Sequence, residues 1–86
     1  MDKLEALKID LGINKDNYDD RLNEYLNYAQ AEIEREGIEL IDNIEDNNLI
    51  VMYAAWLWRK RDTGEGMPRM LRYALNNRLF GGHLDG

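Results

Sequence analysis

The chain contains no cysteine, and only one proline, one histidine and one phenylalanine occur among its 86 residues. The absence of cysteine excludes a disulfide framework and cysteine-ligated metal clusters, and it is compatible with a reducing cytoplasm. The single histidine, His83, lies near the C-terminus, where a side chain is far more often surface decoration than a catalyst. The first ten residues lack the apolar core of a signal peptide, so we expect neither secretion nor membrane insertion.

Long hydrophobic runs are also missing. The longest, LIVMYAAWLW at residues 49–58, has ten residues, whereas a bilayer span needs roughly 20. Read as a helix, it divides into two opposite stripes: Leu49, Met52, Tyr53 and Trp56 on one side, and Val51, Ala54, Ala55 and Trp58 on the other. A helix that is apolar on all sides must be covered on all sides. We expect the first stripe to form the monomer core and the second to need a partner, such as another copy of the chain.

The composition, with 44% hydrophobic and 33% charged residues, is typical of one small globular domain. The net charge of −6 is unevenly distributed, because residues 1–50 carry a net charge of −9 and residues 51–86 carry +3. Such an asymmetry can orient subunits head to tail, with the acidic side against the basic side. The alternative is that acidic helices simply keep a small protein soluble.

Apolar periodicity predicts an all-α fold, a small four-helix domain that occupies residues 1–86. We expect a short first helix, a long second helix, a buried third helix and a C-terminal fourth helix: Lys3–Leu11, Tyr18–Glu36, Asp46–Arg61 and a helix that starts at Pro68. Asp2 and Glu5 form a capping-box pattern, and Gly12 and Gly37 supply the left-handed residues that end the first two helices. Residues 38–45 fit either a short strand or an ordered loop.

The remaining helix signals are weaker. Asn17 is the expected N-cap of the second helix, and Gly81 and Gly82 are expected to stop the fourth. The apolar stripe of the fourth helix should consist of Met67, Met70, Leu71, Ala74, Leu75 and Leu79.

The sequence offers few candidates for catalytic residues. Catalysis usually needs a nucleophile with a base, a poised acid–base pair or a metal, and no such pattern is recognisable. The turn DTGEG at residues 62–66 lacks the lysine and spacing of a phosphate-binding loop. The acidic segment at residues 42–47 lacks the glycine and the twelfth-position glutamate of a calcium-binding EF-hand. We therefore expect no enzyme activity, no catalytic residue, no cofactor and no metal site.

DNA binding is the alternative function, as a small helical regulator that uses the fourth helix. Basic residues end the third helix and decorate the fourth, and they include Arg69, Arg72 and Arg78. Two observations oppose this reading. The sequence pI of about 4.6 is unusual for an autonomous DNA-binding domain, and Arg78 points about 180° away from Arg69 around a helix.

Two segments resemble the small head–tail connector (adaptor) proteins of long-tailed bacteriophages. The first half contains LKIDLGI followed by YDDRLNEYLNYAQAEIEREGIEL, and the second contains LIVMYAAWLWRKR, a short loop and MPRMLRYALNNRLF. The resemblance covers nearly the whole chain. It implies a helical virion protein at the head–tail junction that is assembled in the host cytoplasm.

The resemblance also implies the partners. The chain would form a homo-oligomeric ring, commonly dodecameric, below the portal protein of the filled head. The ring would extend the channel for DNA, without sequence-specific binding, and would offer a platform for a stopper or tail-completion protein. For the subunit contact we expect Val51, Trp58, Arg59, Arg69 and Arg72, the two last meeting a neighbour's acidic helix. For docking to the portal, the apolar residues near the C-terminus are Leu79, Phe80 and Leu84.

Overall fold

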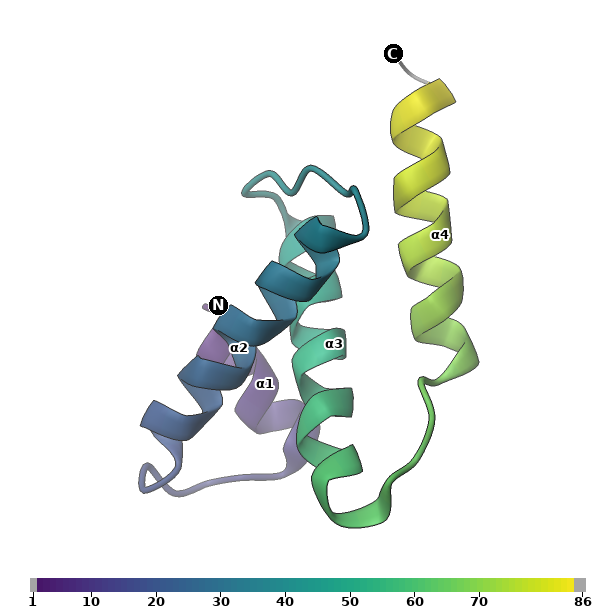
Figure 1. Cartoon of the computed structure of the whole chain (residues 1–86). Helices are drawn as coiled ribbons and strands as arrows, with labels where there is room; N and C mark the ends of the chain where they lie inside the picture. The colour runs from purple at the N-terminus through teal and green to yellow at the C-terminus, as the bar shows by residue number, and fades with distance from the viewer. Residues whose placement is uncertain (1, 85–86) are drawn as a thin grey trace.

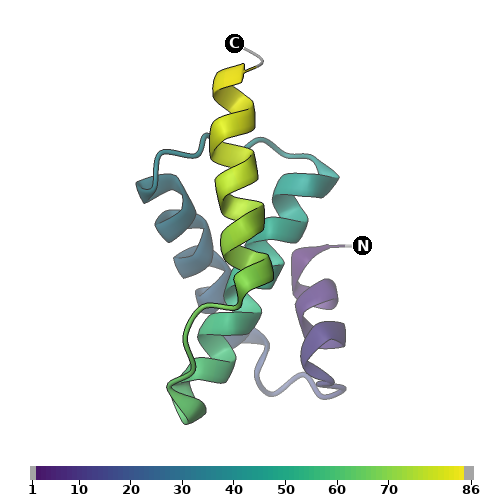
Figure 2. The same cartoon turned by 90° about the vertical axis from the view of Figure 1, so that its right-hand side faces the viewer.

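Four helices make up the computed structural model, which describes residues 2–84 and, for the last three of these, the backbone alone. They are α1 (Lys3–Leu11), α2 (Asp19–Arg35), α3 (Ile44–Thr63) and α4 (Arg69–Leu84). No strand occurs within residues 2–84, which confirms the all-α four-helix prediction and makes residues 38–43 a loop. α3 lies at the centre, with α1 and α2 on one side and α4 along the other (Figure 1). A quarter turn of the view places α4 in front of α3 (Figure 2).

Side-chain caps and left-handed glycines set most helix ends. The Asp2 carboxylate accepts the Glu5 backbone N–H at 2.8 Å, as the capping-box pattern predicts. Gly12 ends α1 with φ of 70°. The Asn43 side chain accepts the Asp46 backbone N–H at 2.7 Å, so α3 begins two residues earlier than the sequence suggests.

Two predicted helix ends are wrong. α2 begins at Asp19 after Tyr18, which makes no side-chain cap, so Asn17 is not the N-cap. α4 continues through Gly81 and Gly82 to Leu84. Glycine lowers helix propensity by about 1 kcal/mol relative to alanine, but it ends a helix only where the backbone turns left-handed.

The apolar run on α3 is covered by the chain's own helices. Leu7 of α1 and Leu22, Ala29 and Ile33 of α2 are fully buried in the same core as the run. On the stripe that was expected to need a partner, Val51, Ala54 and Ala55 are at most 3% exposed. That expectation is therefore wrong for these three residues, because α1 and α2 both pack against α3.

α4 packs chiefly against α3, through a narrow apolar contact. Leu71 and Leu75 are each 1% exposed and lie in the common core, and Leu79 is half-buried against it. Arg72 adds a link to the end of α2, since its guanidinium donates to the Glu36 carboxylate at 2.8 Å. Both side chains of this ion pair are partly exposed, so solvent weakens it.

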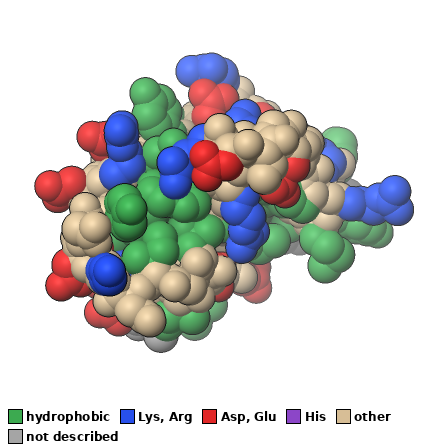
Figure 3. Space-filling view, turned by 90° about the horizontal axis from the view of Figure 1, so that it is seen from below, with side chains coloured by type: hydrophobic (Ala, Val, Ile, Leu, Met, Phe, Trp, Pro, Cys, Tyr) green, Lys and Arg blue, Asp and Glu red, His purple; other side chains and the backbone are tan. Residues whose placement is uncertain are grey.

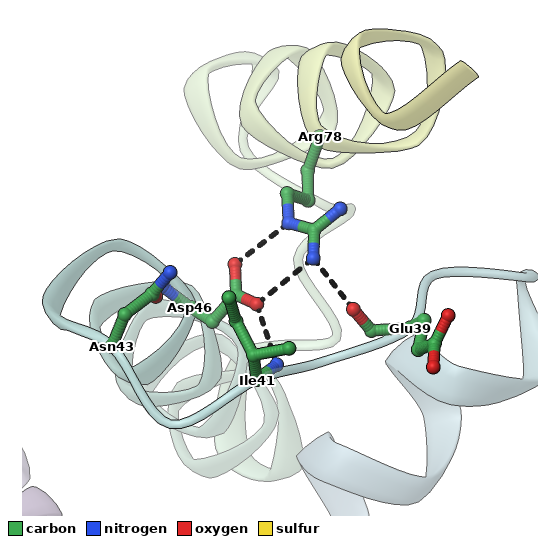
Figure 4. Close-up of polar contacts among 5 residues, drawn as sticks. All are labelled: Glu39, Ile41, Asn43, Asp46 and Arg78. Atoms are coloured by element: carbon green, nitrogen blue, oxygen red, sulfur yellow. Dashed lines mark hydrogen bonds and ion pairs between the residues drawn. The ribbon is translucent and has the colours of Figure 1, made fainter. Parts of the chain in front are cut away.

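A buried carboxylate anchors the second half of α4. Asp46, in the first turn of α3, is 1% exposed, and its two oxygens accept hydrogen bonds from Arg78 at 2.8 and 3.1 Å. The same carboxylate accepts the Ile41 backbone N–H at 2.8 Å, and Arg78 also donates to the Glu39 carbonyl (Figure 4). One ion pair therefore joins α4, the start of α3 and the loop between α2 and α3.

The charges of this anchor support each other. The hydrogen bond from Arg78 lowers the pKa of Asp46, against the opposing effect of burial, and the Ile41 N–H lowers it further. The hydrogen bond to Asp46 likewise raises the pKa of Arg78. A carboxylate buried this deeply stays ionised because its oxygens are paired with a cation and a backbone donor.

Removing either partner of the anchor should destabilise the fold and release α4. We expect Arg78→Ala to cost about 2–4 kcal/mol, because Asp46 would be left buried with only the Ile41 N–H as partner for as long as α4 stays packed; detachment of α4 would expose Asp46 to water and relieve that cost. Urea unfolding measures the loss, and amide hydrogen exchange should show that α4 loses protection before α1–α3.

Arg72→Ala is the matched control on the same helix, since it removes an ion pair that is partly exposed. It should cost less than about 1 kcal/mol. Equal losses for Arg72→Ala and Arg78→Ala would contradict the anchoring role.

Acid should remove the stabilisation that Asp46 supplies. Its folded-state pKa lies below the ordinary value of 3.8, so the contribution is complete well above pH 3.8. It declines as the unfolded chain begins to take up protons near that pH, and it is lost once the pH falls below the folded-state pKa. The difference in unfolding free energy between the wild type and Asp46→Asn, measured from neutral pH to pH 2, should shrink over this window; a constant difference would contradict it.

Candidate interaction surfaces

The residues predicted for subunit contacts do not form one patch. Val51 is 2% exposed and lies beneath a small groove of about 190 Å³ between α1 and the start of α3. Trp58 is half-buried near the other end of α3, and the nearby Arg59 is exposed, with its guanidinium 3.4 Å from the Asp10 carbonyl oxygen. Arg69 is exposed at the start of α4. The structure therefore offers two separate regions, the C-terminal end of α3 and the outer face of α4.

Trp58 belongs to an aromatic cluster at the C-terminal end of α3. The rings of Tyr18 and Tyr25 meet it edge to face, with centroids 5.7 and 5.4 Å away, and the Arg61 guanidinium lies 3.9 Å from its centroid. Such pairs add to the stability that area burial provides. Seen from below, hydrophobic side chains gather in a hollow beside the end of α3, with basic side chains at its edge (Figure 3).

A groove of about 910 Å³ runs between α2 and the C-terminal half of α3. We call it the α2–α3 groove; its apolar and aromatic lining consists of Tyr25, Tyr28, Tyr53, Trp56 and Leu57. Its charged lining consists of Arg21, Glu24, Glu32, Lys60, Arg61 and Glu65. Tyr28 is 65% exposed, so most of its ring faces solvent.

The tryptophan of the groove is held in place by three contacts. The Tyr53 and Trp56 rings meet edge to face at 5.4 Å, and the Lys60 ammonium lies 4.5 Å from the Trp56 centroid. The Trp56 indole N–H donates to the Glu65 carbonyl at 3.3 Å. Burial raises the pKa of the Tyr53 phenol, with further contributions from Glu36 and Glu32, so this hydroxyl stays protonated at neutral pH. The groove is therefore a preformed aromatic surface.

α4 presents a second apolar surface on its outer face. Met70, Tyr73 and Phe80 are 75%, 63% and 60% exposed, and their spacing of three and seven residues places them on one side of the helix. Leu71 and Leu75 lie on the opposite side, in the core. We call these three exposed residues the α4 outer stripe. The sequence prediction that Met70 packs inward is wrong, because Met70 is one of the most exposed hydrophobic residues of the chain.

The three residues predicted to dock to the portal do not all face solvent. Leu79 is half-buried and points toward the body of the molecule, since a Cβ at Gly37 would meet its Cδ1 at 3.7 Å. Phe80 is exposed on the α4 outer stripe. The side chain of Leu84 lies outside the described residues, so its predicted contact stays a prediction.

Two arginines of α4 form ion pairs within the chain, and a third is exposed to solvent. Arg72 and Arg78 pair with Glu36 and Asp46 of the same chain, which leaves Arg69 as the arginine of α4 without an ion pair among the described residues. A basic surface on this helix is thus smaller than the sequence suggests. Arg72 in particular already has an acidic partner within the chain.

Sequence reasoning missed the Asp46–Arg78 anchor and the α4 outer stripe. Asp46 gave a partial signal, because it stands three residues after the capping Asn43, but its burial depends on α4 folding back over α3. The stripe had a clearer signal in the spacing of Met70, Tyr73 and Phe80, which runs opposite to Leu71 and Leu75.

Within the described residues, no group of three or more His, Cys, Asp or Glu side chains is placed to hold a metal ion. No helix within residues 2–84 combines the length and the hydropathy that a membrane crossing requires.

Comparison with known proteins assigns the family. Residues 1–77 match the sequence model of the family described as phage gp6-like head-tail connector protein. No curated protein and no solved structure matches the chain. Because the family match covers all of α1–α3 and the first half of α4, and agrees with the all-α fold, the chain belongs to the phage gp6-like head-tail connector family, a family of structural proteins of the virion.

Proposed function

We propose that this chain forms a ring, dodecameric in the virion, directly below the portal protein. The ring extends the DNA channel and provides the platform to which a stopper or tail-completion protein attaches. The observation that carries this proposal is the family match over residues 1–77. Assembly takes place in the host cytoplasm, and the function requires ordered protein contacts, without turnover chemistry, cofactor or metal.

The charge of the chain supports a role around passing DNA. Residues 1–50 carry 14 acidic and 5 basic side chains. A wall that repels phosphate lets DNA slide through a channel, whereas a wall rich in lysine and arginine would hold it through phosphate contacts. DNA is therefore a passing partner, bound without sequence specificity.

The best candidates for protein contacts are accessible or partly accessible residues at the C-terminal end of α3 and along α4. We assign Trp58, Arg59 and Arg69 to the subunit contact, whereas Val51, which is buried, and Arg72, which pairs with Glu36, contribute to the fold of the chain itself. For docking to the portal we assign the C-terminal end of α4, where Phe80 offers the exposed aromatic ring, beside Leu79 and Leu84.

The alternative of a DNA-binding regulator has less support. It requires a basic face on α4, yet the guanidinium groups of Arg72 and Arg78 are paired with Glu36 and Asp46. A protein that reads DNA through a helix needs such side chains free to reach phosphates and base edges.

The connector role predicts that the protein is a virion component present as one ring per particle. Quantitative mass spectrometry of purified virions, with the portal protein as internal standard, should give about as many copies of this chain as one ring contains. Heads that lack this chain should retain the portal but fail to join tails. Absence from purified virions would contradict the proposal.

Trp58→Ala tests the assignment of the α3 end to the subunit contact. Loss of a half-buried indole that contacts Tyr18 and Tyr25 should cost about 2 kcal/mol of stability, so the variant should still fold in the cold. Ring incorporation should fall further than this loss explains, because the indole edge also contacts the neighbour.

Tyr18→Ala is the control, since it removes one of the same ring contacts from the other side. Both variants are compared by thermal unfolding and by incorporation into virions at a temperature where each is folded. Normal incorporation of folded Trp58→Ala, or equal defects in both variants, would remove Trp58 from the subunit contact.

A further inference from the structure

We propose that the α4 outer stripe of one copy docks into the α2–α3 groove of the next copy. This inference rests on the proposed ring. It adds two surfaces to the subunit contact beside Trp58 and Arg59, and it reassigns Phe80 from portal docking to the contact between subunits. Each copy would offer Met70, Tyr73 and Phe80 to one neighbour and accept the same three side chains from the other neighbour in its groove.

The two surfaces agree in length. Met70 and Phe80 are ten residues apart on α4, which corresponds to about 15 Å along a helix. The groove follows α2 from Arg21 to Glu32, a distance of about 16 Å at the same rise per residue. Its volume of about 910 Å³ has room for one thioether and two aromatic side chains.

The two surfaces also agree in chemistry. The groove is lined by the rings of Tyr25, Tyr28 and Trp56, and aromatic pairs favour edge-to-face contacts of the kind that Tyr73 and Phe80 can supply. Methionine makes favourable contacts between its sulfur and ring edges. Large, exposed aromatic and methionine side chains are the residues that recur at the centres of protein interfaces.

Charge favours a contact of α4 with α2 of the next copy over a contact between two α4 helices. Residues 69–84 contain three arginines and no acidic residue, whereas α2 carries five acidic residues and two arginines. The charged lining of the groove is balanced, with Arg21, Lys60 and Arg61 beside Glu24, Glu32 and Glu65. The acidic partners that the groove offers to Arg69, next to Met70, are Glu24 and Glu32 on the α2 wall. A contact between two α4 helices would instead bring like charges together without an acidic partner.

The positions of the two surfaces make the contact head to tail. The α4 outer stripe points away from α3, while the groove opens between α2 and α3, so the two cannot meet within one chain. A contact between unlike surfaces is heterologous. A heterologous contact gives an open filament unless its rotation divides a full turn without a rise along the axis, in which case it closes into a ring. This is the symmetry that a connector below a portal requires.

Disulfide trapping tests the contact directly, because the chain has no cysteine of its own. Tyr73→Cys lies on the stripe and Tyr28→Cys in the groove, and both positions are more than 60% exposed, so neither change should disturb folding. A mixture of the two single variants should give a covalent heterodimer under mild oxidation. A chain that carries both changes should give a ladder of covalent oligomers, both at high protein concentration and in assembled virions.

Ile44→Cys is the control for exposure alone, because Ile44 is 88% exposed at the start of α3, outside the groove. Paired with Tyr73→Cys, it should give no heterodimer above background. Homodimers of Tyr73→Cys in place of heterodimers would indicate a contact between two α4 helices and would overturn the proposal. A Tyr73 cross-link to the portal in virions, without one to Tyr28, would overturn it as well.

A mixing experiment separates this contact from the connector role. Tyr73→Asp with Phe80→Asp disables the stripe, and Tyr28→Lys disables the groove by placing a cation opposite Arg69. Neither variant alone should enter virions as a ring, but a mixture should give a dimer of one copy of each in native mass spectrometry, because one intact contact remains. If the wild type enters virions and both variants do so equally well, the connector role stands and the docking contact is wrong. If the wild type itself is absent from virions, the connector role fails.

Discussion

The position of α4 depends on one buried carboxylate. Asp46 is the buried charged residue of the described chain, and it is stable there because Arg78 and the Ile41 N–H satisfy its oxygens. Leucine contacts alone would let α4 slide or rotate on α3, since apolar contacts are not directional. A two-oxygen pairing between a guanidinium and a carboxylate has a defined geometry, so it fixes the rotation of α4 about its axis. That rotation decides which side chains of α4 face solvent.

The anchor thus links the interior to the outer surface. With Arg78 and Leu75 turned inward, Tyr73 and Phe80 must point outward, because all four share one helix. The same anchor holds the loop between α2 and α3 through the Glu39 carbonyl and the Ile41 N–H. The chain therefore covers its most apolar helix by itself and still exposes a separate aromatic surface for contact with other proteins.

The sequence was a good guide to features that depend on neighbouring residues. The four helices, the Asp2–Glu5 cap and the end of α1 at Gly12 follow from local patterns of spacing and capping. Predictions of burial from the sequence failed where the exposure of a residue depends on which other helix covers it. Two stripes on α3 looked like one core and one interface, because the pattern cannot show that α1 is long enough to cover Val51.

Charged residues were the hardest to place. An arginine on a helix looks the same in sequence whether it faces solvent, as Arg69 does, or a buried acid, as Arg78 does. Burial of Asp46 arises from contacts 32 residues apart, which no local pattern encodes. Met70 was assigned to the inward-facing stripe of the fourth helix together with Leu71, but Met70 is 75% exposed whereas Leu71 is buried in the core.

The fixed rotation of α4 has a geometric consequence for any assembly built through it. In a closed ring, the angle between successive subunits equals a full turn divided by their number. A ring of twelve needs about 30° per contact and a ring of thirteen about 28°, so the two differ by only about 2° at each joint. With α4 held at one end by the connection from Gly64 to Pro68 and at the other by Arg78, the angle between its outer face and the groove is set inside a single subunit. If the proposed ring is built through this contact, its number of subunits would follow from the orientation in which the Asp46–Arg78 pair holds α4.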